Sequence, residues 1–282
     1  MDRTQITFGQ AEGVSALPSQ QQLKSVSAET RAALWAVIYG SLTFSQRQIY
    51  GDWAVVLRDW HVTREFQAID DFREGYESVV PKLKNLVFNG TYVEIFDFLQ
   101  FAIRHRNRPY RLDEGIAYNL TRTKAAYRLE GKTFFPVQSE EDAATVSRAF
   151  RDAAGHRGAL QHLKNSAEAA TAGEWAESIT QSVHAVEAIS KLLAPGTNTL
   201  RPALDELEKH HKIHGALKQG FLRIYDFTSD EKGLRHSLLD KEASDVDESD
   251  ALFMLGACSA FVSYLVAKAR AADLPIDQND NS

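Results

Sequence analysis

Apolar residues recur at helical spacing along most of the chain, so the pattern predicts a mainly α-helical protein. Residues 1–27 show no clear period and predict an extended, turn-rich lead-in. The first helix is expected to begin after Ser27, an N-cap residue. Its apolar positions then repeat on one face, at Leu34, Trp35, Ile38 and Leu42.

More amphipathic segments follow in the first half of the chain, and we expect helices at 48–59, 70–88, 90–106 and 111–123. Pro81 lies inside the second of these and should kink it or mark a break, because proline lacks the backbone N–H that a helix interior needs. Residues 126–137 then change the pattern. Two short β-prone runs flank Gly131, which can adopt a positive φ, and they predict a small β-hairpin.

From about residue 156 the chain predicts a second helical set, with helices near 157–171, 174–193, 199–209, 213–226 and 248–271. The last is apolar on most sides, which is typical of a helix at the centre of a bundle or in an interface. The pattern therefore predicts two helical domains with a small hairpin. We expect a helical N-terminal domain at 1–155, a helical bundle at 156–272 and a disordered polar tail at 273–282.

Composition fits a soluble, folded, intracellular protein. The 282 residues are 44% hydrophobic and 25% charged, which are ordinary values for a globular chain. No uninterrupted apolar stretch approaches the length of a membrane span, and the first residues do not resemble a secretory signal. The single cysteine, Cys258, cannot form an internal disulfide. These features predict a cytoplasmic location without membrane contact.

The net charge of −6 is carried entirely by the second half, because residues 1–155 hold equal numbers of acidic and basic side chains. An acidic bundle is a poor non-specific binder of nucleic acid. The common phosphate-binding, dinucleotide-binding, zinc-protease and α/β-hydrolase motifs are also absent from the sequence. Their absence argues against those enzyme classes, and no cofactor is expected.

The most basic segment follows the expected helix 90–106 and contains Arg104, Arg106, Arg108 and Arg111. These arginines could contact RNA or another phosphate. The favoured interpretation is simpler: cations at a helix C-terminus offset the helix dipole.

Histidines supply two further candidates. His210, His211 and His214 lie close together, and a metal site there is a minor hypothesis because no further ligand is evident. His184 and Glu187 lie one turn apart on an expected long helix, as a functional pair or as a solvated contact.

Cys258 lies on the most apolar helix and is expected to be buried and inert.

Arg235 and His236 form the strongest candidate site. They follow an acidic turn that includes Asp230. An arginine held by carboxylates can bind a phosphate, and an imidazole can transfer protons near neutral pH. The alternative is that Arg235 only anchors its loop through an ion pair.

Several segments resemble a known family, namely residues 175–188, 200–204, 224–236 and 253–264. They are similar to the HEPN-type domain of AbiJ-like abortive-infection proteins. Residues 8–14 and Leu34–Trp35 are similar to the helical N-terminal domain that accompanies it there. The resemblance covers most of the chain and is more specific in the last 110 residues.

The resemblance implies a helical bundle that dimerises and acts as a metal-independent ribonuclease in phage defence. In such domains an arginine holds the scissile phosphate, and a histidine four to six residues later moves the proton during attack by the ribose 2′-OH. Here Arg235 matches the arginine, but Asp240 begins the stretch where the later histidine belongs. His236 would then transfer the proton, and Glu187 is similar to the acidic residue that faces the motif.

Two functions follow as expectations. The favoured one is a dimeric antiphage endoribonuclease that uses Arg235, His236 and Glu187, with Asp230, Asp240 and His184 as supporting residues. The alternative is a non-catalytic helical module for dimerisation or for binding a ligand or partner.

Overall fold

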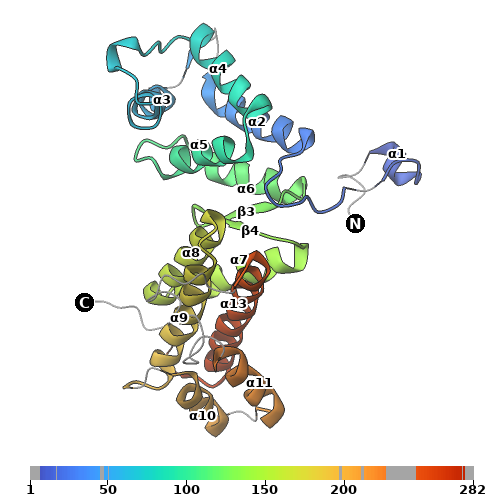
Figure 1. Cartoon of the computed structure of the whole chain (residues 1–282), viewed down its shortest axis with the longest axis vertical. Coiled ribbons are helices and arrows are strands. Elements are labelled where there is room, and N and C mark those ends of the chain that lie inside the picture. Colours follow the sequence, from blue (N-terminus) through green and yellow to red (C-terminus); the bar gives the residue numbers. More distant parts are fainter. Residues whose placement is uncertain are drawn as a thin grey trace. The chain divides into compact units, whose positions relative to one another are not determined.

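The computed structural model describes residues 7–16, 18–44, 48–49, 51–196, 199–210, 213–226, 246–274 and 276. Within these residues the protein is mainly α-helical, as the sequence predicts (Figure 1). It has two small antiparallel hairpins, of which the sequence predicted only β3–β4. Contacts divide the chain into two compact units, Met1–Glu140 and Glu141–Ser282. Helix α7 (Glu140–Asp152) therefore belongs almost entirely to the second unit.

The first unit contains these elements: α1 (Phe8–Ala11), α2 (Ala28–Leu42), β1 (Thr43–Phe44), β2 (Gln48–Ile49), α3 (Gly51–Thr63), η3 (Ile69–Asp71), α4 (Tyr76–Asn89), α5 (Tyr92–Arg104), α6 (Leu112–Arg122), β3 (Tyr127–Glu130) and β4 (Thr133–Pro136). Ser27 caps α2 as expected, because its Oγ accepts a hydrogen bond from the Thr30 backbone N–H at 3.1 Å. The β3–β4 hairpin is confirmed, and Gly131 has a φ of 53°.

Three details of this unit differ from the sequence predictions. The lead-in contains one helical turn, α1, which Thr7 and Gln10 close with a capping box. Residues 48–49 pair with β1 instead of starting a helix, so α3 begins only at Gly51. Helix α4 runs through Pro81 without a break. Apolar side chains are buried on both sides of the proline, and their packing outweighs the hydrogen bond that it lacks.

A core of apolar side chains holds the helices of the first unit together. Leu34, Ile38, Trp53 and Phe98 are among its fully buried members. The Trp53 ring stacks on Phe98 with centroids 6.1 Å apart, which joins α3 to α5.

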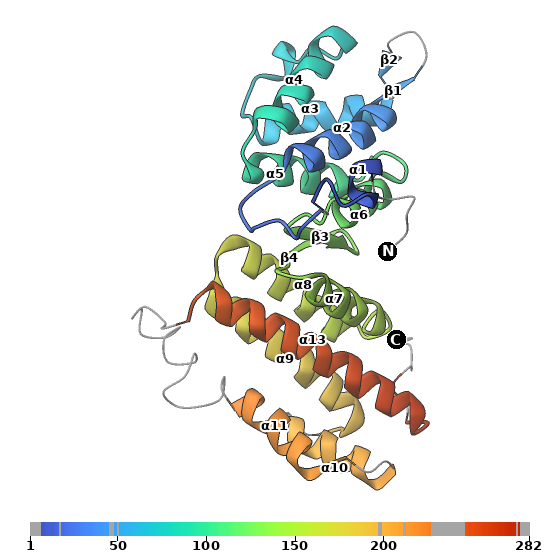
Figure 2. The same cartoon turned by 90° about the vertical axis from the view of Figure 1, so that its right-hand side faces the viewer.

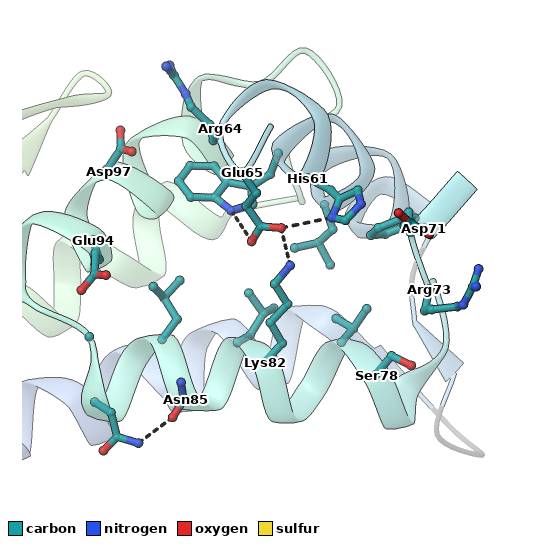
Figure 3. A pocket seen from close by; sticks show the side chains of 18 residues that line it. His61, Arg64, Glu65, Asp71, Arg73, Ser78, Lys82, Asn85, Glu94 and Asp97 are labelled. Atoms are coloured by element: carbon teal, nitrogen blue, oxygen red, sulfur yellow. Dashed lines mark hydrogen bonds and ion pairs between the residues drawn. The ribbon is translucent and has the colours of Figure 1, made fainter. Parts of the chain in front are cut away.

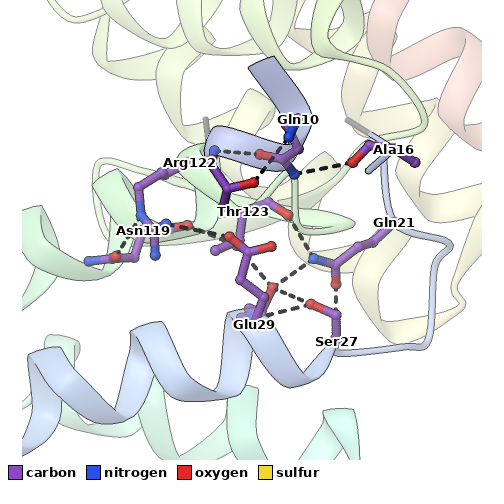
Figure 4. A network of polar contacts seen from close by, with 10 residues as sticks. Gln10, Ala16, Gln21, Ser27, Glu29, Asn119, Arg122 and Thr123 are labelled. Atoms are coloured by element: carbon purple, nitrogen blue, oxygen red, sulfur yellow. Dashed lines mark hydrogen bonds and ion pairs between the residues drawn. The ribbon is translucent and has the colours of Figure 1, made fainter. Parts of the chain in front are cut away.

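Polar contacts attach the irregular lead-in to α2 and to the end of α6 (Figure 4). Gln21 Nε2 donates to Thr30 Oγ1 at 2.7 Å and to the Thr123 carbonyl at 2.8 Å. Thr30 Oγ1 in turn donates to Thr123 Oγ1 at 2.9 Å. Since Thr30 and Thr123 are both buried, this network satisfies polar groups that would otherwise destabilise the fold.

The second unit contains six described helices: α7 (Glu140–Asp152), α8 (Arg157–Ala172), α9 (Trp175–Leu193), α10 (Leu200–His210), α11 (Gly215–Asp226) and α13 (Glu248–Ala271). Helix α9 packs most extensively on α8 and α13, and α10 lies against α9 and α11 (Figure 2). The expected helices of this half are confirmed to within a turn. The helical-bundle prediction for this half of the chain is therefore confirmed.

Helix α13 is long and apolar enough to cross a membrane by length and composition alone. Half of its most apolar stretch is buried inside the unit. Its central residues, including Leu255, Val262 and Leu265, pack in the bundle with almost no exposure. This is the arrangement of a helix at the centre of the bundle, one of the two positions that its sequence pattern predicts.

Candidate functional site

The ribonuclease hypothesis depends most on four residues that the structure does not describe. Arg235, His236, Asp230 and Asp240 lie outside the described residues. Glu187 and His184 are described, and both lie on α9. The candidate site is therefore built from the surroundings of these two side chains.

Small residues let α8 and α9 approach closely. Ser166 Oγ donates to the Ser178 carbonyl at 2.9 Å and lies 2.7 Å from Ser182 Oγ, and all three serines are fully buried. Near the start of α8, a Cβ added at Gly158 would lie 3.8 Å from the Ala188 Cβ. Because these contacts repeat along the two helices, they fix which residues of α8 face which residues of α9.

His162 of α8 faces α9. Its Nδ1 lies 2.7 Å from Gln181 Oε1, and Gln181 Nε2 donates to Glu177 Oε1 at 2.7 Å. The amide nitrogen of Gln181 donates its hydrogen bond to Glu177. The amide oxygen therefore faces His162, and an amide oxygen can only accept a hydrogen bond. Nδ1 of His162 must therefore carry a proton, and in the neutral ring Nε2 keeps a free lone pair.

His184 of α9 lies beside His162, with the ring centroids 5.3 Å apart and the planes at 63°. Its Nε2 is 4.0 Å from Glu187 Oε2, and its side chain is 41% exposed. Glu187 is held in turn by α11, because the Tyr225 hydroxyl donates to Glu187 Oε1 at 2.6 Å. Two imidazoles thus lie side by side at an accessible surface. An amide orients His162, and a carboxylate lies near His184.

Helical spacing in the sequence indicated His184 and Glu187, but His162, Gln181 and Tyr225 were not predicted from it. Periodicity places His162 one turn before the buried Ser166, a signal that its helix face turns toward the bundle. No sequence signal indicated which helix it would meet, because that depends on the packing of α8 against α9.

The histidine-rich segment does not form a metal centre in the described part of the chain. His210 Nε2 lies 3.9 Å from Glu206 Oε1, and His214 Nδ1 accepts from the Ala216 N–H at 3.3 Å. His211 lies outside the described residues. Among the described residues, no three His, Cys, Asp or Glu side chains converge as ligands.

The basic segment after α5 is largely engaged within its own unit. Arg104 Nε donates to the Lys132 carbonyl at 3.1 Å, and Arg111 pairs with Glu114 at 2.6 Å. Arg108 Nε lies 4.0 Å from Asp113, while Arg106 is exposed. These contacts favour the interpretation of a solvated helix end over a dedicated phosphate site.

The first unit contains a cavity of about 680 Å³ that the sequence analysis did not predict (Figure 3). Helices α3, α4 and α5 and the loop around η3 line it. Trp60, Phe72 and Leu86 contribute apolar surface, and His61 and Lys82 contribute polar groups. Concave, partly apolar sites with a few converging polar groups are typical of small-molecule binding.

Glu65 is the polar centre of this cavity. Its Oε1 accepts from the Trp60 indole N–H at 3.2 Å, and its Oε2 contacts both Lys82 Nζ and His61 Nδ1 (Figure 3). Burial alone would raise the pKa of the Glu65 carboxyl, but the hydrogen bond and charge of Lys82, with hydrogen bonds from His61 and Trp60, lower it overall. The carboxylate is thereby held ionised on the cavity wall.

Cys258 is buried, as expected, and burial raises the pKa of its thiol to about 12. A thiol with that pKa is not a nucleophile at neutral pH. The prediction that Cys258 is an inert core residue is confirmed.

Comparisons with family models, characterised proteins and solved structures gave no match. Any assignment of function must therefore be argued from the residues and their geometry.

Proposed function

We propose that this protein is a HEPN-type antiphage defence protein of the abortive-infection kind, acting in the cytoplasm as a dimeric, metal-independent endoribonuclease. In this proposal Arg235 holds the scissile phosphate, His236 serves as acid or base, and Glu187 orients the reacting groups. The substrate is RNA, and the ribose 2′-OH is the nucleophile. No metal or cofactor takes part.

The observation that carries the proposal is the 2.6 Å hydrogen bond from Tyr225 to Glu187. Tyr225 is the penultimate residue of α11, and Arg235 follows ten positions later in the sequence. The bond therefore fixes the end of α11 at the acidic residue that the family resemblance singles out. The imidazole of His184, near Glu187, and that of His162, near His184, are acid–base groups of the kind that such a site requires.

An exposed apolar face of α13 supports dimerisation. Phe253 is 62% exposed, although it lies on a helix whose other large apolar side chains are mostly buried. Small residues follow it at helical spacing, at Gly256 and Ala260, and they would permit close approach of a second helix. A second copy of this bundle is the partner that the proposal requires.

The test is incubation of the purified protein with total RNA and with tRNA in the presence of EDTA. The wild type should cleave, and the double variant R235A/H236A should not. The matched control is R201A/H210A, which removes the same residue types from α10. Cleavage by R235A/H236A at the wild-type rate would refute the assignment of these residues.

The cavity around Glu65 favours a second candidate, a non-catalytic module that dimerises and binds a ligand in the first unit. A cavity of about 680 Å³ has the size of a small-molecule site. This alternative predicts a folded dimer that leaves RNA intact under all conditions. It also predicts that a bound metabolite raises the unfolding temperature of the wild type and not of L86W, which would fill the cavity.

A further inference from the structure

We infer that His162 and His184 form the acid–base pair of an RNA-cleaving site on the α8–α9 surface, with His162 as the base and His184 as the acid. This inference rests on the proposed function and assigns the proton transfers to two described imidazoles instead of to His236.

The hydrogen bonds of each ring determine its role. The Nδ1–H of His162 points at Gln181 Oε1, so its Nε2 offers a lone pair that can remove a proton. Gln181 is itself held by Glu177, so the ring is oriented by a chain of two hydrogen bonds. An orienting group behind a histidine is the arrangement that positions a general base.

His184 has the opposite environment. Its Nε2 faces the Glu187 carboxylate at 4.0 Å, so its acceptor partner is a carboxylate instead of an amide oxygen. The Tyr225 hydroxyl fixes the carboxylate from its other oxygen. The titratable groups around the pair are therefore Glu187 and Tyr225 on the His184 side and Glu177, through Gln181, on the His162 side.

The two histidines can supply the proton transfers for RNA cleavage in which the 2′-OH of the RNA is the nucleophile. Nε2 of His162 takes the proton of the 2′-OH, and the 2′-oxygen forms a bond to phosphorus while the bond from phosphorus to the 5′-oxygen breaks. His184 gives its proton to the departing 5′-oxygen. The products are a 2′,3′-cyclic phosphate and a 5′-hydroxyl, and neither water nor a metal ion is consumed.

The packing of the two helices makes the pair rigid enough for this task. Ser166 lies one turn from His162, and Ser182 follows Gln181 directly, so the buried serine contacts lock the register at the imidazoles. The ring centroids are 5.3 Å apart, which allows one phosphodiester to touch both rings. Since His184 is 41% exposed, a polymer can reach it.

The experiment uses the full-length protein with an RNA oligonucleotide, in EDTA, and compares H162A and H184A with H210A as the matched control on α10. General acid–base groups contribute about 10²–10⁴-fold in rate, so each of the first two variants should lose about that factor while H210A should not. H162Q and H184Q, which keep a polar side chain, replace any alanine variant whose thermal unfolding shows that it is not folded.

A second substrate separates the two roles. An oligonucleotide in which sulfur replaces the 5′-oxygen at the cleavage site has a leaving group that needs no proton. H184A should cleave it at nearly the wild-type rate, whereas H162A should remain slow. Equal rescue of both variants would overturn the assignment of acid and base.

The remaining outcomes distinguish this inference from the proposed function. If the wild type cleaves and only H236A or R235A is inactive, with H162A and H184A as fast as H210A, the inference is wrong and the proposed function stands. If the wild type releases no cyclic phosphate from any RNA, both are wrong.

Discussion

Arg128 Nη2 donates to Glu140 Oε1 at 2.6 Å and thereby connects strand β3 to the first residue of α7. The Arg128 side chain is only 4% exposed, whereas that of Glu140 is 41% exposed. Burial lowers the pKa of the Arg128 guanidinium, and the Glu140 carboxylate counteracts this effect. A second acceptor, Gln20 Oε1, lies 3.2 Å from the same nitrogen and comes from the lead-in.

Replacing Glu140 by alanine should therefore destabilise the protein. The change leaves a buried cation without its carboxylate, which costs about 1–3 kcal/mol of unfolding free energy. Urea denaturation at neutral pH measures the loss. E141A removes the neighbouring exposed carboxylate and should leave the midpoint unchanged, and equal effects of the two variants would contradict the role given to Arg128.

The lowered pKa of Glu65 predicts a pH-dependent contribution to stability. A carboxyl whose pKa is lower in the folded state stabilises the fold above its unfolded-state pKa, near 4.5, and loses this contribution as the pH falls through the folded-state value. E65Q should therefore be less stable than the wild type at pH 7 by about 1–2 kcal/mol. The difference should shrink below pH 4.5.

Denaturant unfolding of both proteins between neutral pH and about pH 3 checks this window. E74Q is the control, because Glu74 is exposed in the same loop, and its unfolding free energy should follow the wild type throughout. A stability difference for E65Q that stays constant across the series would show that the lowered pKa of Glu65 does not stabilise the fold.

Replacing glycine by alanine should have opposite effects on stability at two helical positions. At Gly158 an added Cβ meets the Ala188 Cβ at 3.8 Å, an ordinary contact, so G158A should stabilise α8 by up to about 1 kcal/mol. At Gly115 the added Cβ would lie 2.8 Å from Val37 Cγ1, so either the Val37 side chain must shift or α6 must move away from α2. G115A should cost about 1–3 kcal/mol. Thermal unfolding of the pair gives the sign in each case.

The exposed face of α13 predicts a solution dimer that depends on Phe253. F253E places a charge at the centre of the proposed contact, and desolvating that charge is costly, so the variant should be a monomer. Light scattering coupled to gel filtration measures the mass. V93E changes a similarly exposed apolar residue of α5 and should remain dimeric. If the wild type has the mass of a monomer, the proposed dimerisation through α13 is wrong.

Much of the helical pattern could be predicted because its signals are local. The Ser27 cap, the apolar repeat from Leu34 to Leu42 and the Gly131 turn act through residues a few positions apart. Helix α13 matches its expected range of 248–271, because a long apolar run with an acidic start permits few alternatives. Pro81 does not break its helix, for the opposite reason: the packing of α4 overrides a local preference.

The sequence by itself determined the helical class, most helix positions and the presence of His184 and Glu187 on one face of α9. Only the tertiary structure decided that His162 lies against His184, that Tyr225 holds Glu187, and that Lys82 reaches Glu65 across a cavity. These partners are separated by many residues of chain. Their meeting depends on how helices pack against one another, as where the buried Ser166 brings α8 close to α9. No periodicity within one helix carries that information.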